Sequence, residues 1–219
     1  MEILKYGALG VFFVSTAIHL YASLKKNQRL RDLTKPFILL ALLGFYCASA
    51  NPIVLTVVLA LAFSWLGDVL LMKNGIKWFT AGGIAFMVSH VFFILSYLKQ
   101  TDFSSFHWLV VAGLIVFFVA ASVVIFHYLR PYLPKALCYP MLLYLIINGL
   151  MNCFAWFRSL TIGGAAGIIT AVGALLFFVS DCSLFFVRFH KNSPLKTHFV
   201  VMLTYAVGEF LIVLGLILG

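Results

Sequence analysis

Three acidic side chains lie inside long apolar runs of the sequence, where they are best placed to do chemistry. Asp68, Asp181 and Glu209 are flanked mainly by residues such as Leu, Val and Phe, whereas the other three acids lie near the N-terminus or in polar breaks. A carboxylate costs several kcal/mol in hydrocarbon, so it normally faces a bundle interior or a water-filled cavity and takes part in function.

Asp68 and Asp181 are predicted to lie at the same depth in a membrane. Asp68 precedes Lys73 by five residues and Asp181 precedes Arg188 by seven. At 1.5 Å per residue, both lie about 7–11 Å inside the boundary that the basic residues mark. Neighbouring carboxyl groups push their proton affinities apart, which makes one an acid and the other a base. The alternative is that each only fixes helix packing through hydrogen bonds.

Other polar residues within the apolar runs are predicted to face the same interior. They are His19, His90, the i, i+4, i+8 series Tyr144, Asn148 and Asn152, and the pair Tyr205 and Glu209. A buried histidine can orient a carboxylate, donate to a phosphate, or serve packing alone. The four cysteines stand singly inside apolar runs without metal-like spacing, which favours a packing role. We therefore expect no metal site and no cofactor.

The elements that position these residues are predicted to be transmembrane helices. The 219-residue chain is 64% hydrophobic and only 10% charged, which excludes an ordinary soluble domain. Its apolar runs and polar breaks predict an all-α integral membrane protein, a single domain over residues 1–219 with eight transmembrane helices. The expected spans are 6–24, 35–49, 52–72, 78–98, 107–127, 136–156, 162–187 and 197–218, of which the second is the shortest.

The distribution of positive charge predicts the orientation. Twelve of the fifteen Lys and Arg residues fall in the breaks after the first, third, fifth and seventh spans, and only Lys5, Lys99 and Arg158 fall on the opposite side. Since cytoplasmic loops retain Lys and Arg, both termini are expected outside the cytoplasm. This placement explains the net charge of +9 without a nucleic-acid partner. Met1–Leu24 has no signal-peptide features, so the first helix is expected to be retained, as in a bacterial cytoplasmic membrane protein.

Two short motifs suggest an internal 4+4 repeat. Gly67-Asp68-Val69-Leu70 lies in the third predicted span, and Ser180-Asp181-Cys182-Ser183-Leu184 lies in the seventh. Each is third in a set of four, so two such halves would place the acids symmetrically about a central cavity.

Three segments carry recognisable motifs: Phe63 to Met72, the pair Ser89-His90, and Phe177 to Asp181 with Leu184 and Arg188-Phe189. These motifs resemble the YhhN-like family of lysoplasmalogenases. The resemblance implies eight transmembrane helices and hydrolysis of the vinyl ether bond of a lysophospholipid substrate drawn from membrane lipid, with no metal. Asp68 and Asp181 would be the catalytic pair. The basic groups expected at the cavity mouth to hold the phosphate are Lys73, Lys77, Arg188 and Lys191, for each of which a purely topogenic role is the alternative.

Two other functions compete with this interpretation. A proton- or cation-coupled transporter would use the same buried acids and histidines as a relay. An intramembrane aspartyl protease is suggested by Leu66-Gly67-Asp68, but the motif lacks its first glycine and Ser180 precedes the second aspartate. A serine or cysteine hydrolase is disfavoured because no Gly-x-Ser-x-Gly elbow occurs.

Overall fold

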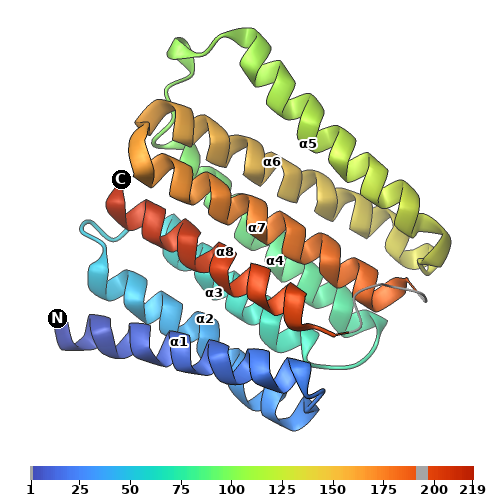
Figure 1. The fold of residues 1–219 in the computed structure, drawn as a ribbon. Helices are drawn as coiled ribbons and strands as arrows, with labels where there is room; N and C mark the ends of the chain where they lie inside the picture. The colour runs from blue at the N-terminus through green and yellow to red at the C-terminus, as the bar shows by residue number, and fades with distance from the viewer. Residues whose placement is uncertain (1, 191–196) are drawn as a thin grey trace.

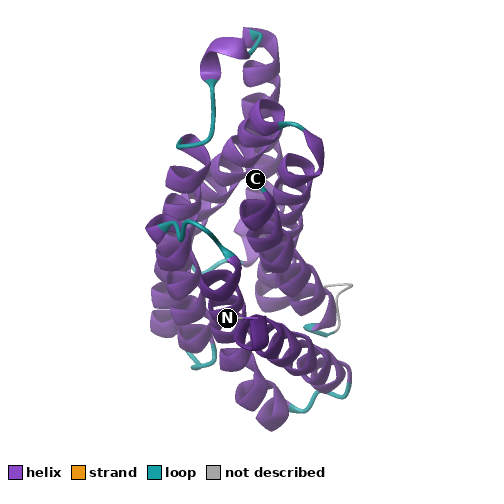
Figure 2. Cartoon of the chain, turned by 90° about the vertical axis from the view of Figure 1, so that its left-hand side faces the viewer, coloured by secondary structure: helices purple, strands orange, loops and turns teal. Residues whose placement is uncertain are grey.

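The chain folds into a bundle of helices. The computed structural model describes residues 2–190 and 197–219, and within them it has eight α-helices and no strand. Both termini lie at one end of the bundle (Figure 1), and a view turned by 90° shows mainly short connections (Figure 2). The helices are α1 (Glu2–Leu24), α2 (Gln28–Ser49), α3 (Leu55–Leu71), α4 (Ile76–Leu98), α5 (Trp108–Leu129), α6 (Cys138–Ile162), α7 (Gly164–Phe189) and α8 (Phe199–Leu218). The predicted all-helical class is confirmed.

Seven of these helices are long and apolar enough to cross a membrane, as expected of a multi-pass membrane protein. The exception within the described residues is α3, which has 17 residues. Helix α5 lies at the edge of the bundle (Figure 1) and exposes bulky apolar side chains such as Val116 and Phe117. Such a surface suits contact with lipid, because hydrocarbon tails are as apolar as these side chains.

The lengths predicted for the second and third spans are wrong. Helix α2 begins at Gln28 because Asn27 caps it by accepting a hydrogen bond of 3.2 Å from the backbone N–H of Leu30. Its first turns therefore carry Arg31, which the predicted spans leave in a break, and Lys35, the first residue of the predicted second span. Helix α3 instead starts only at Leu55, after an extended segment whose Val54 N–H donates to the Tyr46 hydroxyl at 3.0 Å.

Arg158 was predicted to lie in a loop, and this prediction is also wrong. The arginine is fully buried near the end of α6. Its guanidinium donates to Gln100 Oε1 at 2.6 Å, to Thr170 Oγ1 at 2.7 Å and to the carbonyl of Gly215 at 3.1 Å. These bonds join α6 to α7, α8 and the end of α4, so the charge is satisfied inside the protein.

Glycines allow the closest helix contact. A Cβ added to Gly173 of α7 would lie 2.6 Å from the backbone nitrogen of Ile212 and 2.7 Å from the carbonyl oxygen of Gly208, both in α8. Gly163, by contrast, has a φ of 68° and ends α6, so it makes the turn into α7. The two backbones of α7 and α8 can therefore approach in the way typical of small residues in membrane bundles.

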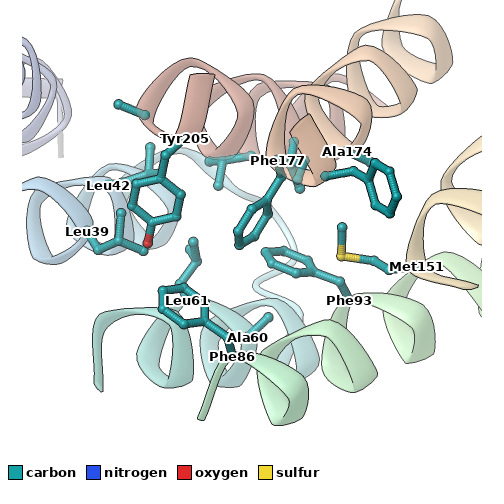
Figure 3. Close-up of a cluster of buried hydrophobic side chains, with 14 of the residues drawn as sticks. Leu39, Leu42, Ala60, Leu61, Phe86, Phe93, Met151, Ala174, Phe177 and Tyr205 are labelled. Atoms are coloured by element: carbon teal, nitrogen blue, oxygen red, sulfur yellow. The ribbon is translucent and has the colours of Figure 1, made fainter. Parts of the chain in front are cut away.

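The core is aromatic where the helices converge. Tyr205 of α8 and Phe177 of α7 point into one buried cluster (Figure 3), with ring centroids 5.4 Å apart. Phe86 of α4 packs edge-on against both, at 6.0 Å from Tyr205 and 6.1 Å from Phe177. These rings hold α4, α7 and α8 at the depth of the buried acids.

Candidate functional site

Asp68 and Asp181 line the same cavity. The cavity lies among α1, α2, α3, α4, α7 and α8, towards the end of the bundle opposite the termini, and has an empty volume of about 680 Å³. Both side chains are buried, at 2% and 5% exposed. The structure thus brings together the two acids that the sequence singled out.

The carboxylate of Asp68 is held by a cation and a phenol. Lys35 Nζ of α2 lies 3.1 Å from its Oδ1, and the Tyr205 hydroxyl donates to its Oδ2 at 2.9 Å. Lys35 itself is mostly buried, with 17% of its side chain exposed. A charge-assisted contact of this kind fixes the carboxylate in the cavity wall.

Asp181 is held by neutral donors instead. The Tyr144 hydroxyl donates to its Oδ2 at 2.5 Å, and the Asn148 amide donates to the same oxygen at 2.7 Å. His90 Nε2 lies 3.8 Å from that oxygen, which is too far for a hydrogen bond. No hydrogen bond from a described residue reaches Oδ1, so this oxygen is free to act on a ligand.

The residue before each aspartate is small for a physical reason. A Cβ on Gly67 would lie 2.6 Å from the Phe86 ring, so only glycine lets that ring pack against α3. Ser180 Oγ donates to the carbonyl of Val201 at 2.8 Å and joins α7 to α8. The small-residue-Asp pattern therefore reflects close packing at the level of the acids.

A second, apolar pocket adjoins the polar cavity. It has an empty volume of about 580 Å³ and lies mainly between α4, α6 and α7, where its walls are side chains such as Ile84, Met141 and Phe185. Asp181 lines both spaces. A substrate with a polar part and a hydrocarbon part can therefore span the boundary between them.

Basic side chains surround the polar cavity. The residues that line it are Arg31 and Lys35 of α2, Arg188 of α7, His19 of α1 and His198 just before α8. Burial, together with the positive charges of Arg31, Lys35 and Arg188, lowers the pKa of His198 to about 4. His198 is therefore neutral at pH 7, and three permanent cations converge on this space.

The lysines expected at the cavity mouth lie elsewhere. Lys73 is exposed and sits over the ring of Trp78 at 4.0 Å, a cation–π contact. Lys77 is exposed in the first turn of α4. Neither residue lines either of the two pockets. Lys191 lies outside the described residues. Of the cations predicted to hold a phosphate, Arg188 alone among described residues lines the cavity.

The remaining predicted site residues divide into two groups. His19, Tyr144 and Tyr205 line a pocket, and His19 Nδ1 forms a hydrogen bond of 3.0 Å with the Thr34 hydroxyl. His90, Asn148 and Glu209 are fully buried behind the pocket walls. The Glu209 carboxyl lies within interaction range of Ser64, Asp68 and Asp181 without a well-formed hydrogen bond. It is therefore positioned to act on the pair rather than on a ligand.

The residues that sequence reasoning missed are Arg31, Lys35 and His198. Lys35 precedes Asp68 by 33 positions, the same separation that Asn148, which donates a hydrogen bond to Asp181, has from that aspartate. This equal spacing is a signal in the sequence that could have identified Lys35. Among the described residues, no group of three or more His, Cys, Asp or Glu is placed to hold a metal ion.

Comparison with known proteins identifies a family. No curated protein and no solved structure matches the chain significantly. The model of the YhhN family matches residues 30–216, which include both aspartates and Lys35 but not α1. Because this match covers most of the sequence, the chain belongs to the YhhN family.

Proposed function

We propose that this protein hydrolyses the vinyl ether bond of lysoplasmalogens and releases a fatty aldehyde and a glycerophospho-choline or -ethanolamine. Membership of the YhhN family suggests a lysoplasmalogenase-like activity. The observation that carries the proposal is the placement of Asp68 and Asp181 in one polar cavity that adjoins an apolar pocket. An amphiphilic substrate needs both spaces, and its ether bond lies at the junction between its polar and apolar parts.

The surroundings of the two acids favour different roles. Asp68 is paired with Lys35, and a nearby cation favours the ionised form of a carboxyl group, so Asp68 is the candidate base. Asp181 lies beside the apolar pocket and accepts only neutral donors on Oδ2. Its Oδ1 can therefore carry the proton that the reaction needs, so Asp181 is the candidate acid.

The proposed reaction consumes one water molecule. Asp181 transfers a proton to the vinyl carbon farther from the ether oxygen, which forms a new C–H bond and leaves an oxocarbenium ion. Asp68 stabilises this cation and accepts a proton from the water that attacks its carbon. The hemiacetal then breaks its bond to the glycerol oxygen, which takes the proton from Asp68. The hemiacetal hydroxyl gives its proton to Asp181 as the aldehyde forms, so the pair ends as it began.

The membrane setting follows from the arrangement of the helices. Both termini lie at the same end of the bundle (Figure 1), which requires an even number of crossings if the chain runs back and forth. We therefore count α3 as an eighth span, although its 17 residues rise only about 26 Å. The polar cavity lies at the basic end of α3, so a thinner layer of hydrocarbon remains for this helix to cross. On this proposal the basic end faces the cytoplasm of a bacterial cell and the termini face outward.

A 4+4 repeat would explain how the cavity arises. Lys35 of α2 contacts Asp68 of α3, and Asn148 of α6 contacts Asp181 of α7. Each pair is 33 positions apart, and each joins the second and third helix of a set of four. Helix α2 also packs against α8, as α6 packs against α4. Two related halves would thus place their acids on either side of a shared space.

The decisive experiment is aldehyde release from a lysoplasmalogen by the purified protein in detergent. We expect Asp68→Asn and Asp181→Asn each to lose at least about a thousandfold in kcat, because each removes one partner of an acid–base pair. Asp102→Asn is the matched control, since it makes the same change at an exposed carboxylate. Wild-type turnover in either cavity variant would contradict the proposal.

The same assay separates an enzyme from a transporter. A transporter built on these buried acids needs two compartments and a gradient, whereas detergent solution has neither. Release of aldehyde there supports hydrolysis. If the wild-type protein releases none, the transporter becomes the better interpretation.

A further inference from the structure

The basic side chains of the polar cavity carry donors that the protein does not satisfy. Among the described residues, Arg31 Nε and His19 Nε2 are buried without a hydrogen-bond partner. Both residues line the cavity. A buried donor without a partner is unfavourable, so the Arg31 Nε–H points to a ligand that accepts hydrogen bonds. His19 Nε2 donates to the same ligand in the tautomer that carries the ring hydrogen at Nε2.

The charges of the cavity are also unbalanced. Lys35 forms an ion pair with Asp68, but neither Arg31 nor Arg188 forms a salt bridge with a carboxylate of the described residues. The guanidinium of Arg188 lies 5.9 Å from the centre of the Phe79 ring, a contact that leaves its N–H donors available. Arg31 donates from Nη1 to Gln28 Oε1 at 3.2 Å, but its Nε has no partner. Two guanidinium groups that line one cavity suit a phosphate, whose oxygens accept hydrogen bonds from them.

The apolar pocket lies on the other side of the acids. Leu71, Phe79, Phe86 and Leu184 line both spaces together with Asp181, and so form the partition between them. Beyond the partition the walls are apolar, and Ile84 at its edge is 50% exposed on the surface that would face lipid. A hydrocarbon chain can therefore enter from the side, between α4 and α6, without crossing the basic cavity.

We infer that Arg31, Lys35 and Arg188, with His19 and His198, bind the phosphate of a single-chain lipid whose hydrocarbon chain lies in the pocket between α4 and α6. This inference rests on the proposed function, and it assigns the two ends of the substrate. The phosphate end lies on the α2 side, the chain lies on the α4–α6 side, and the bond between them passes Asp181.

Binding of a lipid that cannot be hydrolysed tests this arrangement without turnover. The probe is a radiolabelled lysophosphatidylcholine analogue with a saturated ether chain, measured with the protein in lipid nanodiscs. Arg31→Gln and Arg188→Gln are each expected to weaken its binding about tenfold, because each removes a charged hydrogen-bond donor. The matching alkyl glycerol, which lacks the phosphate, should bind both variants as it binds the wild type.

A second pair of variants tests the chain pocket. Gly83 lines this pocket, and a Cβ built on it meets no atom within 4 Å. Gly83→Leu should therefore fold normally, fill the pocket and weaken binding of both lipids. Gly113→Leu in α5 is its control, since its Cβ is equally unhindered and lies outside both pockets. Lys77→Gln controls for loss of an exposed positive charge.

The outcomes distinguish the inference from the proposed function. If the arginine variants bind the phospholipid analogue as the wild type does, the phosphate site is overturned even if the enzyme is active. If inorganic phosphate competes as strongly as the phospholipid analogue, the site serves a soluble anion, and the lipid assignment is overturned. If the binding differences appear but no aldehyde is released from a lysoplasmalogen, the lipid site stands and the proposed reaction fails.

Discussion

Asp68 and Asp181 share a cavity, but each receives hydrogen bonds from a different set of donors. One tyrosine donates to each acid: Tyr205 of α8 to Asp68 at 2.9 Å and Tyr144 of α6 to Asp181 at 2.5 Å. The other partner is a lysine for Asp68 and an amide for Asp181. Two carboxyl groups of the same type are thereby placed in unlike environments, which is the condition for an acid and a base to coexist.

Removing one phenol at a time measures what these donors do. Tyr144→Phe and Tyr205→Phe should each lower kcat about tenfold to a hundredfold with little change in KM, because each hydroxyl positions a carboxyl group. Tyr97→Phe is the control, since Tyr97 is also fully buried but its hydroxyl has no hydrogen-bond partner among the described residues. Equal kcat values for all three variants would show that the tyrosines serve packing only.

His198 predicts a pH dependence of stability. Its pKa is about 4 in the folded protein because of burial and the nearby cations, against about 6.5 in an unfolded chain. The unfolded state therefore binds the proton more readily, so this contribution to stability is complete above pH 6.5 and is lost as the pH falls towards 4. We expect His198→Gln to show a smaller fall in Tm over that range than the wild type. Identical Tm profiles would exclude the effect.

At the level of elements, α7 and α8 form the tightest helix pair at the site. Their glycines let the backbones approach closely, and this contact sets the distance between Asp181 on α7 and Tyr205 on α8. Helix α2 contributes in a different way, because its early start at Gln28 brings Arg31 and Lys35 onto a helix that faces the cavity.

The close approach of α7 and α8 can be tested by one methyl group. Gly173→Ala places a Cβ within 3 Å of the α8 backbone, which cannot move aside as a side chain can. The variant should lose about 1–3 kcal/mol of stability and unfold at a lower Tm in detergent. Gly113→Ala adds the same methyl group where nothing lies within 4 Å and should be neutral or slightly stabilising. A Gly173→Ala variant as stable as Gly113→Ala would contradict the close contact.

At the level of the whole molecule, both termini lie at one end of the bundle (Figure 1). The proposed eight crossings would put the α4–α5 connection on the same side as the termini and the α3–α4 connection on the side of the cavity. On the same proposal the cavity side faces the cytoplasm, because cytoplasmic loops retain Lys and Arg.

Labelling of introduced cysteines checks this orientation. We expect a membrane-impermeant maleimide to label Phe103→Cys from outside intact cells and to label Asn74→Cys only after the membrane is opened. Both positions are exposed, and the unmodified chain measures labelling of its own four cysteines. The reverse pattern would contradict the proposed topology, and labelling of both positions from outside would show that α4, which separates them, does not cross the membrane.

The sequence by itself determined the helical class, the presence of acids within apolar helices and the family. Apolar runs of about 20 residues and isolated carboxylates within them are local features, and lipid permits few structures that satisfy them. The family resemblance carried by the motifs around Asp68 and Asp181 is confirmed by the match over residues 30–216.

The tertiary structure decided which basic residues belong to the site. Hydropathy alone cannot distinguish a cation at a membrane surface from a cation that is satisfied by partners on other helices. The charge count therefore groups Arg31, Lys35 and Arg158 with the basic residues of the breaks between spans. The sequence predicts Lys73 and Lys77 at the cavity as readily as Arg188, but in the structure only Arg188 of these three lines it. The partners of a buried charge come from distant parts of the chain, so only the packing of the helices determines them.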